Sequence, residues 1–292
     1  MAVDYTIIGS RLKDARLRAH LTQQELAEKP KAKQYKSLGA MIKDGAFDVF
    51  IKDFPEMQKS GDLKDLFKGE ITKFDELLFQ TVKYLIVKEV QKDPVTQEEK
   101  SVDTGILKEN ALEALQLMLD SGANPNAYMK NGETTVLKLC EINNVEPLKL
   151  VINHKKNPGN IKHEDGIGND ALFYATMAES IVCIDFLVKE LGFDVNRKNF
   201  LAKDQTALHY ACGNLKESSV DKLLELDANP LLKDMYGFKP VDTLTPAYDE
   251  EVREEFSEVP EELPKYDMLY QKMLIITKEY EEKNPIKRKV KF

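Results

Sequence analysis

The side chains best suited to nucleophilic catalysis or metal binding are few in this sequence. Zinc sites are built from closely spaced pairs such as C-x-x-C, and a nucleophile needs a base within reach. No C-x-x-C pair occurs, and the cysteines and histidines are widely separated. We expect buried core thiols, no metal and no cofactor. The residues concerned are Cys140, Cys183, Cys212, His20, His154, His163 and His209.

Motifs that would carry other chemistry are also missing. The sequence has no G-x-x-x-x-G-K-[ST] loop for phosphates, no H-E-x-x-H, no G-x-S-x-G and no glycine run of the dinucleotide-binding type. We therefore predict that the protein is not an enzyme and has no catalytic residue.

Composition excludes or disfavours several further classes of protein. The 292 residues carry a net charge of −8, which disfavours general nucleic-acid binding. No apolar run approaches the roughly 18 residues that span a bilayer, and the N-terminus lacks the long apolar stretch of a secretory signal. Three scattered cysteines indicate a reducing compartment. We expect a cytoplasmic protein, with a nuclear location as an alternative.

The sequence contains internal repeats, and the structural elements that these repeats form must position any site. Thr206–Ala211 reads TALHYA, and Gly168–Ala175 aligns with it 36 residues upstream. A further 36 residues upstream, Gly132–Leu139 has the same pattern. Apolar second helices recur between these segments, and polar turns such as Ser121–Asn126 (SGANPN) follow them. No single unit can bury its own apolar face, so we expect neighbours to stack into one core.

These segments resemble the ankyrin repeat, whose first helix opens with T-P-L-H-x-A. The resemblance covers about residues 105–245. It implies an all-α fold, a solenoid of helix-turn-helix-loop units that binds other proteins. In the family a small alanine stands where Cys140 and Cys212 lie, and the histidine equivalent to His209 bonds within and between repeats.

The resemblance also implies a binding surface on the loop tips and the exposed positions of the first helices. Several residues there are apolar, which is unusual for solvated positions and is typical of interaction sites. Cover by the chain's own C-terminal helix is the alternative. The predicted partner-binding residues are Lys130, Asn131, Glu133, Glu141, Ile142, Ile167, Asn169, Met177, Lys203, Gln205, Asn214, Met235, Tyr236 and Phe238.

Residues 7–29 are similar to the first two helices of lambda-repressor-like helix-turn-helix domains. Thr22 and Glu25 could form a capping box, but Pro30 ends the second helix and no recognition helix follows. A helical pair that packs or associates, a remnant leader, and a DNA-binding unit all remain open.

The two segments flanking the repeats have no named motif. We expect residues 34–104 to be a mostly helical cap, with or without decayed ankyrin-like pairs, that contains a long helix over Phe74–Val90 and an exposed loop over Gln91–Thr104. After residue 245 we expect an acidic linker, an amphipathic helix with Tyr266, Leu269, Tyr270, Met273, Ile276 and Tyr280 on one face, and a basic tail. That helix either caps the last repeat or binds a partner.

The sequence thus predicts four regions: 1–33, a partial helix-turn-helix; 34–104, the helical cap; 105–245, ankyrin repeats; and 246–292, the linker, helix and tail. The function predicted is a non-enzymatic interaction module that binds another protein, as an adaptor or as a subunit of an assembly. A DNA-binding transcriptional regulator is the alternative, and an enzyme built on residues 34–104 is the third class.

Overall fold

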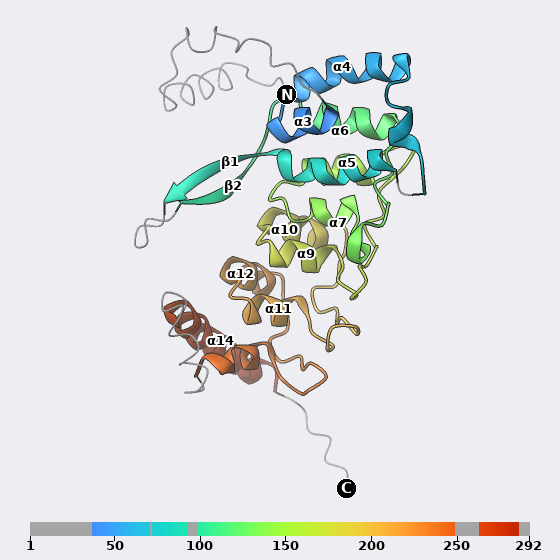
Figure 1. Cartoon of the computed structure of the whole chain (residues 1–292). Helices are drawn as coiled ribbons and strands as arrows, with labels where there is room; N and C mark the ends of the chain where they lie inside the picture. The colour runs from blue at the N-terminus through green and yellow to red at the C-terminus, as the bar shows by residue number, and fades with distance from the viewer. Residues whose placement is uncertain (1–36, 71, 93–98, 249–262, 286–292) are drawn as a thin grey trace, which may run out of the picture. The chain divides into compact units, whose positions relative to one another are not determined.

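The computed structural model describes residues 37–70, 72–92, 99–248 and 263–285 (Figure 1). Its residues from Met41 onward belong to one compact unit. No helix in the described ranges is both long and apolar enough to cross a membrane. The helix-turn-helix-like segment 7–29, the acidic linker before residue 263 and the basic tail after residue 285 lie outside the described residues.

The N-terminal part of this unit consists of helices that surround a cluster of phenylalanines. Phe50, Phe54 and Phe74 are fully buried and stack in series, with ring centroids 5.2 and 5.3 Å apart. This cluster gives residues 47–81 an apolar core of their own. The helices are α3 (Leu38–Asp44), α4 (Phe47–Ser60), η1 (Lys64–Phe67), α5 (Lys73–Thr81), η2 (Val82–Tyr84) and α6 (Ala111–Asp120).

A β-hairpin separates α5 from α6, and it corrects two of the expectations. Strands β1 (Ile86–Lys92) and β2 (Glu99–Leu107) pair antiparallel, with Lys88 opposite Asp103 and Lys92 opposite Glu99. The predicted helix over Phe74–Val90 therefore ends at Thr81, and the predicted loop contains a strand. A short run of apolar residues is compatible with a helix and with a strand. The β-branched residues Ile86 and Val87 favour the strand.

Three helix pairs follow, each with a short first helix and an apolar second helix. The first helix of each pair is capped at its N-terminus by a polar side chain that accepts a backbone N–H of the first turn. The capping residues are Thr134, Asp170 and Thr206. These N-caps are 36 residues apart, so the sequence period is the structural period. The pairs are α7 (Thr135–Leu139) with α8 (Glu146–Ile152), α9 (Ala171–Met177) with α10 (Ile181–Lys189), and α11 (Ala207–Gly213) with α12 (Glu217–Glu225).

The unit α5–α6 has the same design although the sequence period misses it. Thr72 and Asp75 form a capping box at the start of α5, as Thr206 and His209 do at α11. The Asp75 carboxylate also accepts the backbone N–H of Asn124 at 2.6 Å, which ties the turn Ser121–Asn126 to this helix. Helix α5 of the expected cap region 34–104 thus pairs with α6, which belongs to the predicted repeat region 105–245, and a hairpin is inserted between the two helices.

The helices stack in two rows (Figure 1). First helices α5, α7, α9 and α11 contact one another in sequence, and among the second helices α4 contacts α6, α6 contacts α8, and α10 contacts α12. The buried residues lie between the rows, and they include Leu137, Leu172, Leu208 and Leu223. Helices and connecting loops make up the described residues, apart from the hairpin and one isolated bridge, and the predicted helical solenoid is confirmed.

At the C-terminal end the array is closed by η4 (Pro240–Tyr248) and α14 (Leu263–Lys283). Leu269 and Met273 of α14 are buried, and the helix packs on η4. Lys272 pairs with Glu217 and Asp221 of α12. The predicted amphipathic helix is therefore confirmed, and its apolar face caps the last unit.

Candidate functional site

A long loop precedes each first helix, and we call the outer turn of this loop the tip. Successive tips carry exposed apolar side chains. Phe200 and Leu201 are 78% and 72% exposed, which are the largest values among the bulky apolar residues. Water solvates such side chains poorly, and a contiguous exposed patch is typical of an interaction surface. We call the following set the tip strip: Tyr128, Ile167, Phe200, Leu201, Met235, Tyr236 and Phe238.

Hydrogen bonds connect each tip to the next. The Gly166 N–H donates to the Asn131 carbonyl at 2.8 Å, and the Met235 N–H donates to the Lys203 carbonyl at 2.9 Å. Between these two connections, the side chain of Asn199 donates to the Ile167 carbonyl at 3.1 Å. These links hold the apolar side chains on one ordered surface, which reduces the conformational entropy that binding would cost.

Glycine is required at one of these connections. Gly168 has a φ of 79°, and a Cβ there would lie 2.5 Å from the Asn199 side-chain oxygen. A side chain at this position would be strained by its own backbone conformation and would push the neighbouring tip away. The close approach of the two tips therefore depends on Gly168.

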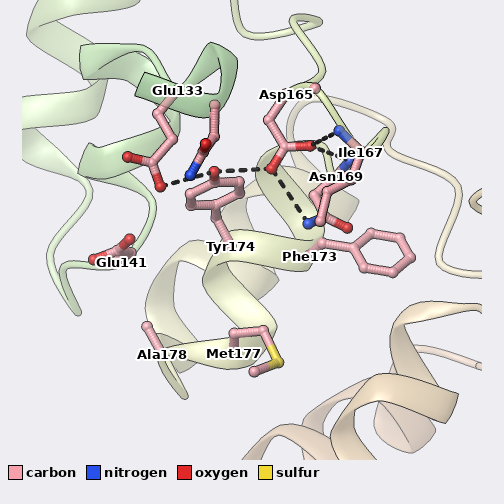
Figure 2. Close-up of a pocket in the computed structure, with 11 residues that line it drawn as sticks. Glu133, Glu141, Asp165, Ile167, Asn169, Phe173, Tyr174, Met177 and Ala178 are labelled. Atoms are coloured by element: carbon pink, nitrogen blue, oxygen red, sulfur yellow. Dashed lines mark hydrogen bonds between the residues drawn. The ribbon is translucent and has the colours of Figure 1, made fainter. Parts of the chain in front are cut away.

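A pocket of about 870 Å³ lies beside the tip strip, between two successive units (Figure 2). Its apolar wall consists of Ile167, Phe173, Met177 and Ala178. The volume falls within the range of pockets that bind small ligands or side chains. The remaining lining residues are Asn131, Glu133, Glu141, Asp165, Gly166, Asn169 and Tyr174.

The carboxylates of the pocket differ in their partners. Glu141 forms an ion pair with Lys138 at 2.6 Å. Glu133 and Asp165 form no ion pair within the described part of the chain, and both accept from one hydroxyl, with Tyr174 Oη 3.3 Å from Glu133 and 3.0 Å from Asp165 (Figure 2). Burial, and then the negative charge of Asp165 and Glu133, raises the pKa of Tyr174, so the phenol keeps its proton.

The structure brings six of the predicted partner-binding residues into this pocket. They come from two neighbouring units, which the common repeat register placed on one surface. They are Asn131, Glu133, Glu141, Ile167, Asn169 and Met177.

A second predicted group lies at the last two tips. Lys203 Nζ is 5.9 Å from the centroid of the Tyr236 ring, and Met235 and Phe238 are exposed beside it. None of these three apolar side chains is covered by α14, so the alternative of cover by the chain's own helix is wrong for them.

The prediction was wrong for Ile142, which is only 5% exposed. Its carbonyl accepts hydrogen bonds from Ser180 Oγ at 2.6 Å and from the Cys183 thiol, so the next helix pair packs directly against it. Ile142 lies three residues after the end of the first helix, α7, where the chain turns toward the core. It belongs to the core.

Three predicted residues lie apart from both groups. Lys130 is exposed and lies on the side of the tip that faces α5, and Asn214 is exposed at the end of α11. Gln205 is half-buried, and its backbone pairs with that of Asn199 in an isolated bridge. No contact brings them to the pocket.

Sequence reasoning missed Tyr128, Phe200 and Leu201 in the tip strip and Asp165 and Tyr174 in the pocket. Phe200 and Leu201 could have been found, because an aromatic and a leucine stand in a loop of polar residues two positions before Lys203. Asp165 carried no such signal, since acidic residues are common in loops.

The three cysteines and His209 are structural, as the sequence indicated. All three cysteines are free and buried, and burial raises the pKa of each thiol. Uncharged thiols at these depths are poor nucleophiles. The described ranges contain no group of three or more His, Cys, Asp or Glu that could hold a metal ion.

His209 connects two units in the way the resemblance implied. Its Nδ1 lies 3.2 Å from the backbone N of Thr206 and 2.8 Å from the Thr206 hydroxyl, and its Nε2 lies 3.0 Å from the Phe238 carbonyl of the next tip. Nδ1 therefore accepts and Nε2 donates in the neutral ring. Burial lowers the pKa of His209, which favours that neutral form.

Comparisons with known proteins agree with this architecture. A family model for ankyrin repeats, in three copies, matches residues 105–199. Among solved structures, the chain is similar to the ankyrin repeat domain of Bcl-3, described as a unique member of the IkappaB protein family. The TM-score is 0.50 at 16% identity, over 82% of this chain and 87% of that chain.

At that identity the structural likeness shows the fold alone, and it extends over most of the array. The ankyrin repeats support a protein–protein interaction module, and the pocket and most of the tip strip lie in the repeat region. The repeat motifs, the 36-residue period of the N-caps and the family match together identify this chain as one that contains ankyrin repeats.

Proposed function

We propose that the protein is a non-enzymatic binding module that holds another protein on the tip strip and the adjoining pocket. The observation that carries this proposal is the row of exposed apolar side chains on successive tips. Aromatic residues and methionine are enriched at the centres of interfaces, and four members of the strip are Tyr or Phe. In this role the protein acts as an adaptor or as a fixed subunit of an assembly.

The regions of the chain have separate tasks in this proposal. Residues 34–104 and the C-terminal helix cover the two ends of the array, as solenoids require, and residues 105–245 present the binding surface. Three free cysteines support a reducing compartment, and we place the module in the cytoplasm. DNA binding through residues 7–29 remains a prediction, because that segment lies outside the described residues.

The partner-binding residues of the proposal are those on the tips and in the pocket. Ile142 is no longer among them. Tyr236 and Phe238 are the anchors with the most exposed aromatic surface at the last tip, and neither side chain supports the core.

The test is capture of partners from the native cell with the wild-type chain and with Tyr236→Ala/Phe238→Ala, followed by quantitative mass spectrometry. We expect the double variant to weaken capture at least tenfold, about 1.4 kcal/mol, with an unchanged melting temperature. Retention of the same partners at wild-type yield would contradict the proposal.

A matched control is available on α14. Met268 and Ile275 are 69% and 59% exposed, yet they lie on the outer face of the capping helix. Met268→Ala/Ile275→Ala removes a comparable apolar surface elsewhere, and we expect capture to be unchanged. Loss of the partner with this variant alone would move the binding surface to α14.

A further inference from the structure

The pocket beside Ile167 has a chemistry that selects one kind of partner side chain. We propose that it binds an arginine of the partner protein, with the alkyl part of that side chain on the apolar wall and the guanidinium between Glu133 and Asp165. The inference rests on the proposed function, because the pocket belongs to the same binding surface.

The charge of the pocket is uncompensated at two positions. Glu141 is neutralised by Lys138, but Glu133 and Asp165 form no ion pair in the described residues. Arg197, the one arginine in the described ranges, is already paired with Glu164 at 2.5 Å and with Asp170 at 3.4 Å. Two like charges on one concave surface repel each other, and a cation placed between them removes that repulsion.

One proton cannot satisfy both carboxylates. The hydroxyl of Tyr174 lies within hydrogen-bond distance of Glu133 and of Asp165, but it donates a single hydrogen at a time. Asp165 has other donors, since its Oδ1 accepts the backbone N–H groups of Ile167 and Asn169. Glu133 has Tyr174 as its side-chain donor in the described chain. A guest with several N–H donors would serve both carboxylates at once.

The walls show that the cation must carry an apolar stem. Ile167, Phe173 and Met177 line the same pocket as the two carboxylates (Figure 2). Arginine and lysine both bury an alkyl stem while the charge reaches a polar group. The guanidinium has five donors in a planar fork and can reach two separate carboxylates, whereas the three donors of an ammonium share one nitrogen. The pocket therefore favours arginine.

Other classes of ligand fit this pocket less well. A metal ion would need converging oxygen ligands, and the apolar wall occupies one side of the pocket. A nucleic-acid backbone is excluded here by its negative charge. A protein partner with an exposed arginine beside apolar residues fits both the pocket and the neighbouring tip strip.

The test uses the full chain with methyl-labelled methionine and isoleucine and three short peptides observed by NMR. The peptides are acetyl-Gly-Arg-Gly-amide, the same peptide with lysine, and the same peptide with citrulline, which keeps the shape of arginine without its charge. Met177 and Ile167 report on the pocket, and Met268 and Ile275 on α14 serve as the reference.

We expect the arginine peptide to shift the Met177 and Ile167 methyls saturably at millimolar concentration, and to leave the α14 methyls unchanged. Lysine should bind more weakly, and citrulline at least about fivefold more weakly, because its neutral head loses the charge interaction. Rising salt should weaken the binding of the two charged peptides, arginine and lysine, and leave that of the citrulline peptide unchanged.

Variants sharpen the result. Glu133→Gln and Asp165→Asn remove one charge each while keeping an acceptor oxygen, and each should weaken arginine binding at least about threefold. Glu217→Gln removes the same charge on α12, which does not line the pocket, and should leave arginine binding unchanged. An unchanged amide spectrum for each variant shows that it is folded, and the salt titration of the wild type stands without any variant.

Three results would overturn the inference: no saturable shift at Met177 and Ile167, equal binding of arginine and citrulline, or equal binding of arginine and lysine. Its failure is distinguishable from failure of the proposed function. If the arginine peptide does not bind but Tyr236→Ala/Phe238→Ala still loses the partner, the tip strip stands and the pocket assignment falls.

Discussion

The tip side of the array and the surface of its second helices are built from the same repeats but present opposite chemistry. On the tip side, apolar groups are exposed and two carboxylates have no ion pair within the described residues. On the second helices, charged side chains pair with one another: Lys189 and Lys222 both contact Asp185, at 2.7 and 3.5 Å, and Lys222 also contacts Glu225 at 2.7 Å.

The pKa directions show the same contrast. Hydrogen bonding to Lys189 holds the pKa of Asp185 below its usual range, and hydrogen bonding to Glu225 raises the pKa of Lys222. These groups are satisfied within the chain. Repeat stacking therefore determines the core and leaves the two surfaces free to differ. Charged groups on the second helices pair with one another, whereas Glu133 and Asp165 on the tip side have no ion pair in the described residues.

The largest expected effect concerns the core that both surfaces share. Leu208→Ala and Leu223→Ala should each lower the free energy of unfolding by about 2–5 kcal/mol, because they leave cavities between stacked helices. Leu224→Ala should cost less, since Leu224 is only half-buried. Urea unfolding measures this. Equal losses for Leu223→Ala and Leu224→Ala would show that the helix is rotated from the orientation described.

The next effect concerns the order of the tips. Asn199→Ala removes the donor to the Ile167 carbonyl and the acceptor of the Leu201 and Ala202 N–H groups. Asn199 is buried, so the groups left unpaired should cost about 1–3 kcal/mol, and partner capture should fall with them. The control Asn214→Ala removes an exposed amide and should have little effect. Wild-type capture and stability for Asn199→Ala would contradict an ordered tip strip.

A smaller effect is the pH dependence of the connection at His209. Its pKa is lowered in the fold, so the unfolded chain takes up a proton first. Stability is full above the unfolded pKa of about 6.5 and falls as the pH decreases toward the lower folded pKa. Urea midpoints between about pH 7.5 and pH 5 should decline more for the wild type than for His209→Gln. Parallel declines would assign the effect to other groups.

The smallest effect belongs to the second-helix surface. Asp185→Asn breaks contacts with two lysines, yet these charges are solvated, and the loss should stay below about 1 kcal/mol and shrink with salt. Partner capture should not change. A capture defect for Asp185→Asn that equals that of Tyr236→Ala/Phe238→Ala would erase the contrast between the surfaces.

The sequence predicted the repeats because their signals are local. Thr134, Asp170 and Thr206 recur every 36 residues, and each caps a helix whose neighbours carry apolar residues at helical spacing. The hairpin was missed because residues 86–107 interrupt that period, and a short apolar run does not distinguish a strand from a helix.

Within the site, repeat register predicted which residues gather at the pocket but not how deep each lies. Ile142 and Met177 both stand near the end of a first helix, yet the next unit covers Ile142 and leaves Met177 half-buried. The role of Asp165 depends on Tyr174, which comes from a helix, and only the folded loop brings the two within 3.0 Å. Such pairs follow from loop conformation, which sequence spacing does not specify.

Hydrogen exchange of the captured complex measures directly whether the partner contacts the tip side. We expect slower amide exchange on partner binding in residues 163–169, 199–205 and 234–238, with no change in the second helices, residues 181–189 and 217–225. Slower exchange confined to the second helices, with the tips unaffected, would contradict it.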